Sequence, residues 1–185
     1  MMEIRLPNAG GAIVACRLTG TPIALAKRKA RDFSRVAFAA AHVVVNPLAD
    51  NDPWLDVAVD WQATLDYRRY VWDPGFGVTE AMDTAQRGGG LDWTGAPALI
   101  RHALAGARDH DDALIACGVG IDQLPPGPSV TIDDVIAAYE TQLGFVEGLG
   151  GRVILMASRA LAADARGPDD DARVDDRILR QAKTR

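Results

Sequence analysis

The sequence over residues 75–88 is Gly75-Phe76-Gly77-Val78-Thr79-Glu80-Ala81-Met82-Asp83-Thr84-Ala85-Gln86-Arg87-Gly88. It begins with apolar residues between glycines, which is typical of a buried strand, and then becomes polar at once. The polar residues have the i, i+3, i+4, i+7 spacing of one helical face: Glu80, Asp83, Thr84 and Arg87. Because α/β folds keep their chemistry where a buried strand ends, this stretch is the first candidate site. A polar helix face turned towards water is the alternative interpretation.

The rest of the chain repeats this strand-then-polar pattern. Apolar runs at residues 35–45, 113–118 and 152–157 predict three more buried strands. Helices are predicted after Asp60, over residues 93–108, over residues 132–148 behind the capping Thr131, and from about Pro168 onwards. Four strand–helix units in succession favour a parallel α/β structure.

An amino-terminal hairpin is predicted over residues 3–18, with its turn at Pro7-Asn8-Ala9-Gly10-Gly11. We therefore expect residues 1–33 to form a hairpin and connector, and residues 34–185 to form the main α/β unit. With 185 residues, the chain is long enough for one substantial core.

Polar residues at the other predicted strand ends extend the candidate site. They are His42, Asp122, Gln123, Ser158 and Arg159, which join Thr79 and Gln86 from the central stretch. We expect Thr79 and Glu80 to lie nearest the ligand. Arg87 would either pair with Asp83 at i, i+4 or hold a ligand carboxylate in bidentate fashion. A core histidine is the alternative interpretation of His42.

Composition excludes several classes of function. A net charge of −5 argues against broad nucleic-acid binding, and no apolar run nears the length of a membrane span. The amino terminus lacks the order of a signal peptide, and Cys16 and Cys117 fit no metal-binding spacing. We therefore expect a cytoplasmic protein with reduced thiols, in which Cys117 is buried in a strand and is not a nucleophile.

The order of these motifs resembles the dihydrodipicolinate synthase and N-acetylneuraminate lyase family. Residues 60–88 are similar to its first helix, second strand and Gly-Thr-Thr-Gly-Glu loop, and residues 115–120 to its third strand. Residues 131–158 are similar to its third helix and fourth strand. Three motifs look closer to an uncharacterised branch, a domain of unknown function: residues 81–88, 122–128 and 154–159.

The resemblance implies a parallel (β/α) barrel of the TIM type, of which this chain would form about four of the eight units. It also implies a Schiff base between a 2-oxo acid and a lysine on the sixth strand, with Thr79 among the hydroxyls that hold the substrate carboxylate. Two departures are that Val78 stands where the family usually has another threonine and that Glu80 follows Thr79 directly. A full barrel takes about 250 residues. The only lysines are Lys27, Lys29 and Lys183, all outside the predicted strands.

Three functions follow as expectations. The first is the amino-terminal part of an aldolase-like lyase that acts on a small carboxylate, without the Schiff-base lysine strand and without a cofactor. The second is a non-catalytic half-barrel that serves binding or assembly. The third is a metal-dependent enzyme that uses Glu80, Asp83, His42 and Asp122, because carboxylates and imidazole suit magnesium, manganese or zinc. In each case we expect a homo-oligomer or a complementary half-barrel as partner.

Overall fold

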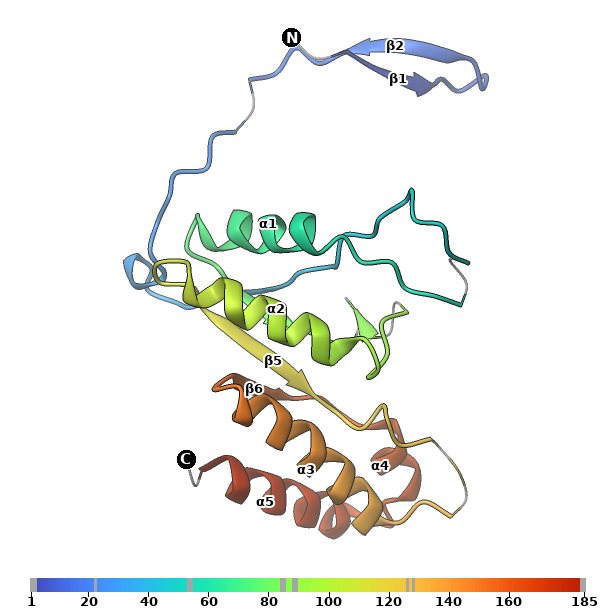
Figure 1. Ribbon diagram of the computed structural model, residues 1–185, viewed down its shortest axis with the longest axis vertical. Helices are drawn as coiled ribbons and strands as arrows, with labels where there is room; N and C mark the ends of the chain where they lie inside the picture. Colours follow the sequence, from blue (N-terminus) through green and yellow to red (C-terminus); the bar gives the residue numbers. More distant parts are fainter. Residues whose placement is uncertain are drawn as a thin grey trace.

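The computed structural model describes residues 3–21, 23–52, 55–83, 86–87, 90–125, 127 and 129–183, without the side chains of Arg159, Asp164 and Lys183. An amino-terminal hairpin is followed by a parallel sheet whose strands alternate with helices (Figure 1). The elements in order are β1 (Glu3–Pro7), β2 (Ile13–Arg17), η1 (Ala30–Asp32), β3 (Phe38–Ala40), α1 (Trp61–Trp72), β4 (Gly77–Glu80), α2 (Ala96–Arg108), β5 (Ile115–Val119), α3 (Ile132–Gly148), β6 (Arg152–Leu155), α4 (Arg159–Asp164) and α5 (Pro168–Lys183).

The main sheet has four parallel strands in the order β3-β4-β5-β6, which is also their order in the sequence. Neighbouring strands that follow one another without a reversal are the arrangement of a barrel wall, whereas a doubly wound sheet reverses its order. The predicted succession of four parallel strand–helix units is therefore confirmed.

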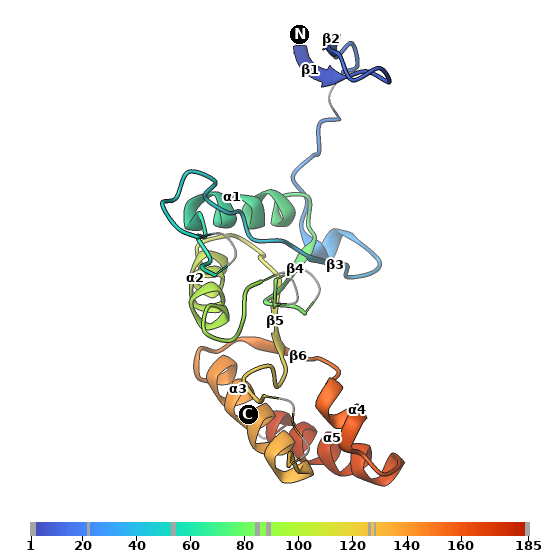
Figure 2. The same cartoon turned by 90° about the vertical axis from the view of Figure 1, so that its right-hand side faces the viewer.

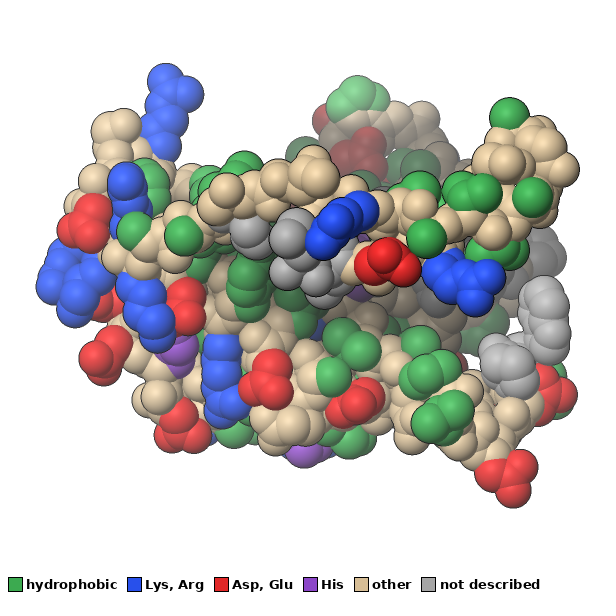
Figure 3. Space-filling model, turned by 90° about the horizontal axis from the view of Figure 1, so that it is seen from above, with side chains coloured by type: hydrophobic (Ala, Val, Ile, Leu, Met, Phe, Trp, Pro, Cys, Tyr) green, Lys and Arg blue, Asp and Glu red, His purple; other side chains and the backbone are tan. Residues whose placement is uncertain are grey.

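The predicted hairpin is also confirmed. Strands β1 and β2 pair antiparallel, and the Asn8 side chain closes the turn by accepting hydrogen bonds from the backbone N–H groups of Gly10 and Ala12, both at 3.0 Å. An extended segment separates the hairpin from the sheet and helices (Figure 2). Apolar hairpin side chains such as Leu6 and Ile13 remain 45% and 55% exposed. Seen from above, hydrophobic side chains lie on the surface among scattered charges of both signs (Figure 3).

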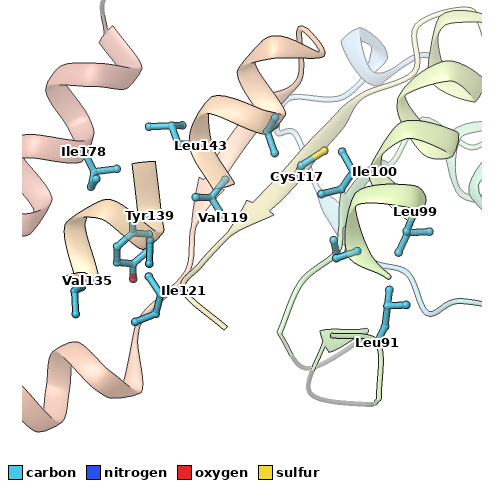
Figure 4. Close-up of a cluster of buried hydrophobic side chains, with 14 of the residues drawn as sticks. Leu91, Leu99, Ile100, Cys117, Val119, Ile121, Val135, Tyr139, Leu143 and Ile178 are labelled. Atoms are coloured by element: carbon cyan, nitrogen blue, oxygen red, sulfur yellow. The ribbon is translucent and has the colours of Figure 1, made fainter. Parts of the chain in front are cut away.

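The larger core lies between the sheet and helices α2, α3 and α5. On β5, Cys117 and Val119 are fully buried and face this core, whose cluster also includes Ile100 of α2, Leu143 of α3 and Ile178 of α5 (Figure 4). A smaller cluster joins Trp72 of α1 to Val78 of β4. The predicted burial of Cys117 is thus confirmed.

Glycines let other side chains lie close over the opposite face of the sheet. A Cβ atom at Gly77 would lie 2.4 Å from a ring carbon of Phe38 on the neighbouring strand. At Gly118 it would meet the carbonyl oxygen of Ala81 at 2.7 Å and the sulfur atoms of Met82 and Met156 at 3.0–3.1 Å. This face is the one that turns inward in a barrel, because the side chains of the alternate residues are directed towards the helices.

The predicted strand over residues 35–45 is much shorter than expected, because β3 holds only Phe38–Ala40. The carbonyl groups of Ala41 and His42 accept hydrogen bonds from Arg68 of α1, and the backbone of Val44 is bound by the Thr64 hydroxyl. Side chains of α1 therefore form hydrogen bonds with the backbone groups that a longer strand would use to pair with its neighbour. Val45 instead forms an isolated antiparallel bridge with residue 59.

The predicted helical face over residues 80–87 is also wrong for the described residues. Ala81 has a φ of 54°, in the left-handed region, which stops a right-handed helix from starting there. The described residues that follow form turns, in which the backbone N–H groups of Gln86 and Arg87 both donate to the Met82 carbonyl. Helix α4, which starts behind the capping Ser158, was not predicted. Within the described ranges, no helix is long and apolar enough to cross a membrane.

Candidate functional site

A cavity of about 410 Å³ lies at the carboxyl ends of three neighbouring strands. Asp83 and Arg87 line it after β4, residues 120–122 after β5, and residues 156–158 after β6. This is the position at which parallel α/β folds hold their ligands.

Arg87 forms the buried wall of this cavity and is 8% exposed. Its Nη1 donates to Asp122 Oδ1 at 2.8 Å and to Gln142 Oε1 at 2.6 Å, and its Nη2 donates to the Gly118 carbonyl at 2.7 Å. The guanidinium carbon lies 4.9 Å from the centre of the Trp93 ring, which is a cation–π distance. Burial lowers the pKa of Arg87, and the nearby Asp122 carboxylate counteracts that shift.

Gln142 of α3 joins these groups and is fully buried. Its Oε1 accepts from Arg87 and from the backbone N–H of Gly120, and its Nε2 donates to Asp122 Oδ1 and to Gln123 Oε1. The side-chain amide thereby uses all four of its hydrogen-bonding positions. A network satisfied to this degree fixes the loop after β5 against α3.

Asp122 is the member of this network that reaches the cavity. Its Oδ1 accepts from both Arg87 and Gln142, while the side chain stays 32% exposed. The carboxylate is therefore held in one orientation by two donors and still presents acceptor surface to a ligand.

Glu80 belongs to a separate buried network on the helix side of β4. Arg68 of α1 pairs with it in bidentate fashion, at 2.9 Å from Nε to Oε2 and 2.8 Å from Nη2 to Oε1. Gln86 donates to Glu80 Oε1 at 3.2 Å and to the Ala41 carbonyl, and its Oε1 accepts from Met82. Burial raises the pKa of the fully buried Glu80, and Arg68 counteracts that shift.

The predicted site residues thus divide between different places. Asp83, Arg87, Asp122 and Ser158 line the 410 Å³ cavity, with Gln123 behind it as a partner of Gln142. His42 and Gln86 line a separate hollow of about 720 Å³ beside residues 43–58. Thr79 is 8% exposed within β4 and does not line the cavity. Thr84 and the Arg159 side chain lie outside the described residues.

Thr79 and Glu80 were expected to lie nearest the ligand, but in the structure Asp83 and Arg87 line the 410 Å³ cavity and Thr79 and Glu80 do not. Glu80 is buried against Arg68, whereas Asp83 and Arg87 reach the cavity. The cause is the left-handed conformation of Ala81, which prevents the helix on which Glu80, Asp83 and Arg87 would have shared one face. The ion pair of Arg87 is formed with Asp122 rather than with Asp83. A bidentate clamp on a ligand carboxylate would use two of the three guanidinium nitrogens of Arg87, and both Nη1 and Nη2 already donate within the protein.

The residues named for a metal centre are also dispersed. Glu80 is paired with Arg68, His42 lines another hollow, and only Asp83 and Asp122 share the cavity. Across the described ranges, no group of three or more His, Cys, Asp and Glu side chains could hold a metal ion.

Sequence reasoning missed Gln142 as a member of the site. The signal was present in the sequence, because residues 135, 138, 139, 142, 143 and 146 form one helical face. On this face the Gln142 amide and the Tyr139 hydroxyl are the only polar side-chain groups. A polar side chain on a buried stripe requires partners, and here the partners are the site itself.

Three comparisons bear on this geometry. The profile of the family described as "Protein of unknown function (DUF993)" matches residues 4–185. A crystal structure of dihydrodipicolinate synthase from Bacillus clausii is 12% identical, with a TM-score of 0.52 over 83% of this chain and 43% of that chain. A second dihydrodipicolinate synthase structure is 12% identical, with a TM-score of 0.48 over 78% and 43%. No curated protein gives a significant match. The likeness to the Bacillus clausii enzyme shows that the chain shares part of the fold of that enzyme, and the chain spans less than half of the length of either structure.

Proposed function

The chain belongs to the DUF993 family of proteins of unknown function, and from this premise we propose that it supplies one wall of the active site of an aldolase-like lyase that acts on a small 2-oxo acid. The observation that carries the proposal is the cavity at the carboxyl ends of β4, β5 and β6, whose polar wall is already fixed by Arg87, Asp122 and Gln142. The likeness of fold to dihydrodipicolinate synthases supports a barrel enzyme of this type.

In this proposal the Schiff-base amine comes from a barrel strand outside these 185 residues. Lys27 and Lys29 pair with Asp73 and Asp112 at 3.0 and 2.8 Å, and these two carboxylates precede β4 and β5. Both amines therefore lie at the amino-terminal end of the sheet, opposite the cavity. Lys183 ends helix α5. An amine that attacks a ketone must be desolvated and close to it, which neither described lysine side chain is.

Borohydride trapping tests this function. Full-length protein is incubated with pyruvate or 2-oxobutanoate and then reduced with borohydride, which converts the imine formed by loss of water into a stable secondary amine. Intact mass should show one adduct per active site, and peptide mapping should place it on a lysine other than Lys27 and Lys29. The double variant Lys27→Arg/Lys29→Arg is the matched control and should trap equally well. No adduct with any 2-oxo acid would contradict the proposal.

A second candidate is a half-barrel that binds or assembles without catalysis. Exposed apolar side chains in and just before the edge strand β3 favour it, since Phe38 is 41% and Val36 is 60% exposed. A stable complex with a second barrel half that traps no 2-oxo acid would select this candidate. For either function, the two free cysteines agree with a cytoplasmic location.

A further inference from the structure

We infer that the amino-terminal hairpin is an arm that packs onto a second copy of this chain. One uncharged face of the hairpin covers an exposed, mostly aromatic patch beside the edge strand of the second copy, whose own hairpin does the same in return. The inference concerns assembly and does not depend on the reaction proposed above.

The pairing of β1 with β2 gives the hairpin one face without charges. Directly opposed residues of an antiparallel pair point to the same side, and successive residues along a strand point to opposite sides. The register therefore places four apolar side chains on one side, here called the apolar face: Ile4, Leu6, Val14 and Cys16. The charged residues of the hairpin lie on the other side: Glu3, Arg5 and Arg17.

This apolar face has no cover within the chain. Leu6 and Val14, which lie opposite one another, are 45% and 38% exposed, and the hairpin stands apart from the sheet and helices (Figures 1 and 2). A two-stranded hairpin alone is marginally stable in water and needs a surface on which to pack its apolar side. The hairpin therefore requires a partner surface.

A matching surface lies at the amino-terminal end of the sheet. It consists of four exposed side chains, here called the edge patch: Phe33, Val36, Phe38 and Phe76. The rings of Phe33 and Phe76 stack at 6.3 Å, and Phe38 begins the edge strand β3 beside Gly77. This end of the sheet is opposite the 410 Å³ cavity, so an arm bound there leaves the cavity open.

The second copy is a better partner than the same chain. Lys27 and Lys29 anchor the connector to Asp73 and Asp112, and the arm beyond them extends away from the helices (Figure 2). A face two strands wide and five residues long measures roughly 17 Å by 10 Å, so folding back would bury only about 300–400 Å². The chain exposes 12134 Å², about 3,500 Å² more than a compact monomer of its mass. Folding back would leave most of that excess in water.

Reciprocal exchange of the arms removes more of this surface. Among the described residues, every exposed large hydrophobic side chain except Leu179 lies between residues 6 and 76, so the arm and the edge patch belong to the same part of the chain. In a two-fold dimer each copy supplies an arm and receives one, and the contact forms twice. Strand β3 has a neighbour on one side only, so the two sheets also approach each other at their open edges.

Two neighbouring residues of β2 provide the test. Val14→Lys places a charge on the apolar face, whereas Ile13→Lys places the same charge on the opposite face of the same strand. Sedimentation velocity of the full chain over a range of micromolar concentrations gives the dissociation constant of each variant. We expect Val14→Lys to weaken association about tenfold or more, because an apolar contact is lost in both arms. Ile13→Lys should weaken it less than about threefold.

A mixture of two variants tests which surfaces meet. Val36→Asp damages the edge patch and leaves the hairpin intact, and Val14→Lys does the reverse. Each variant alone has one damaged side in both contacts, whereas a mixed dimer has one contact with both sides intact. Its other contact brings opposite charges together. The mixture should therefore associate severalfold more tightly than either variant alone.

The possible results separate the second copy from other partners. Neither hairpin residue belongs to the two hydrophobic core clusters, so both hairpin variants should unfold like the wild type when dilute. A Val14→Lys chain that associates normally but unfolds more easily would mean that the arm packs on its own chain, which overturns the inference. Equal effects of Val14→Lys and Ile13→Lys, or a mixture no tighter than its components, would overturn it as well.

Discussion

Arg68 uses all five of its N–H groups inside the protein. Two go to Glu80, and the others go to the carbonyl groups of Ala41, His42 and Thr64. Both members of the ion pair have side chains no more than 1% exposed. Such a pair gains little over an apolar replacement of the same shape, because both charges were taken out of water. Removing one partner is a different matter, because the other charge stays buried without compensation.

We expect Glu80→Ala to lower the free energy of unfolding by roughly 3–5 kcal/mol, because it strands the Arg68 charge in the core. Chemical denaturation followed by circular dichroism measures this loss. Asp66→Ala is the matched control, because it breaks an ion pair with Arg69 on the same helix at the exposed surface. The control should be affected far less. Equal stability of the two variants would show that Glu80 is not part of a buried pair.

The two cysteines should differ in reactivity. Burial raises the pKa of the Cys117 thiol to about 12, with a smaller contribution from Glu80, so almost no thiolate is present at pH 8. Cys16 lies partly exposed in the hairpin. A thiol reagent should therefore label one cysteine quickly in the native protein and both after unfolding. Rapid labelling of Cys117 in the native state would contradict its burial in the core.

Sequence reasoning named Asp122 and Arg87 as candidate site residues but could not pair them. They lie 35 residues apart, and only the parallel packing of β4 against β5 brings them together. Glu80 was expected beside the ligand, whereas the structure pairs it with Arg68 of α1. A charged residue on the apolar face of a helix indicates that it has a buried partner of opposite charge, but the sequence does not identify which acidic residue is that partner.

At the scale of single elements, local signals succeeded where they were complete. Helix α3 begins and ends where the sequence indicated, because Thr131 and Asp134 form a capping box and Gly148–Gly151 interrupt the helix at its other end. The length of strand β3 was mispredicted, because an apolar run does not indicate which tertiary partner binds the carbonyl groups that follow the strand. The shape of the sheet thus depended on the side chains of α1, which local patterns do not describe.

The close packing of β5 against the turn after β4 can be tested with glycine substitutions. In Gly118→Ala the new methyl group would lie 2.7 Å from the Ala81 carbonyl oxygen, which belongs to the backbone and cannot swing aside. We expect a loss of about 1–3 kcal/mol in the free energy of unfolding. Gly144→Ala, at an exposed position of α3, meets nothing within 4 Å and should stabilise the protein by up to about 1 kcal/mol. Thermal and chemical unfolding measure the change in the free energy of unfolding of each variant, which should be a loss in Gly118→Ala and a gain in Gly144→Ala. A destabilised Gly144→Ala would refute the reasoning.

For the whole molecule, the resemblance predicted the fold better than periodicity did. Apolar runs supported parallel strands, but only the order of the motifs indicated a barrel, which the strand order β3-β4-β5-β6 and the likeness to dihydrodipicolinate synthase now support. The surface area of the chain is large for its mass, because the sheet has an open edge and because the hairpin and its extended connector stand apart from the sheet and helices. A compact monomer of 19.7 kDa exposes about 8,600 Å², whereas this chain exposes 12134 Å².

The excess surface leads to our last prediction, that the 185-residue chain associates at micromolar concentration. The difference exceeds the roughly 1,600 Å² that a stable protein–protein interface buries. Part of the exposed surface is apolar, including Phe38 in the edge strand β3 and Val36 just before it. At about 25 cal/mol per Å², a few hundred Å² of apolar surface left in water costs several kcal/mol, comparable with the whole stability of a domain. Sedimentation velocity should show a dimer or larger species, and Val36→Asp should weaken it because a charge then lies on the segment that leads into the edge strand β3. Ile23→Asp places the same charge on the extended connector, where the side chain is 88% exposed, and should leave association unchanged. A cooperatively folded monomer at these concentrations would mean that the open sheet is stable by itself and needs neither a second copy nor a complementary half.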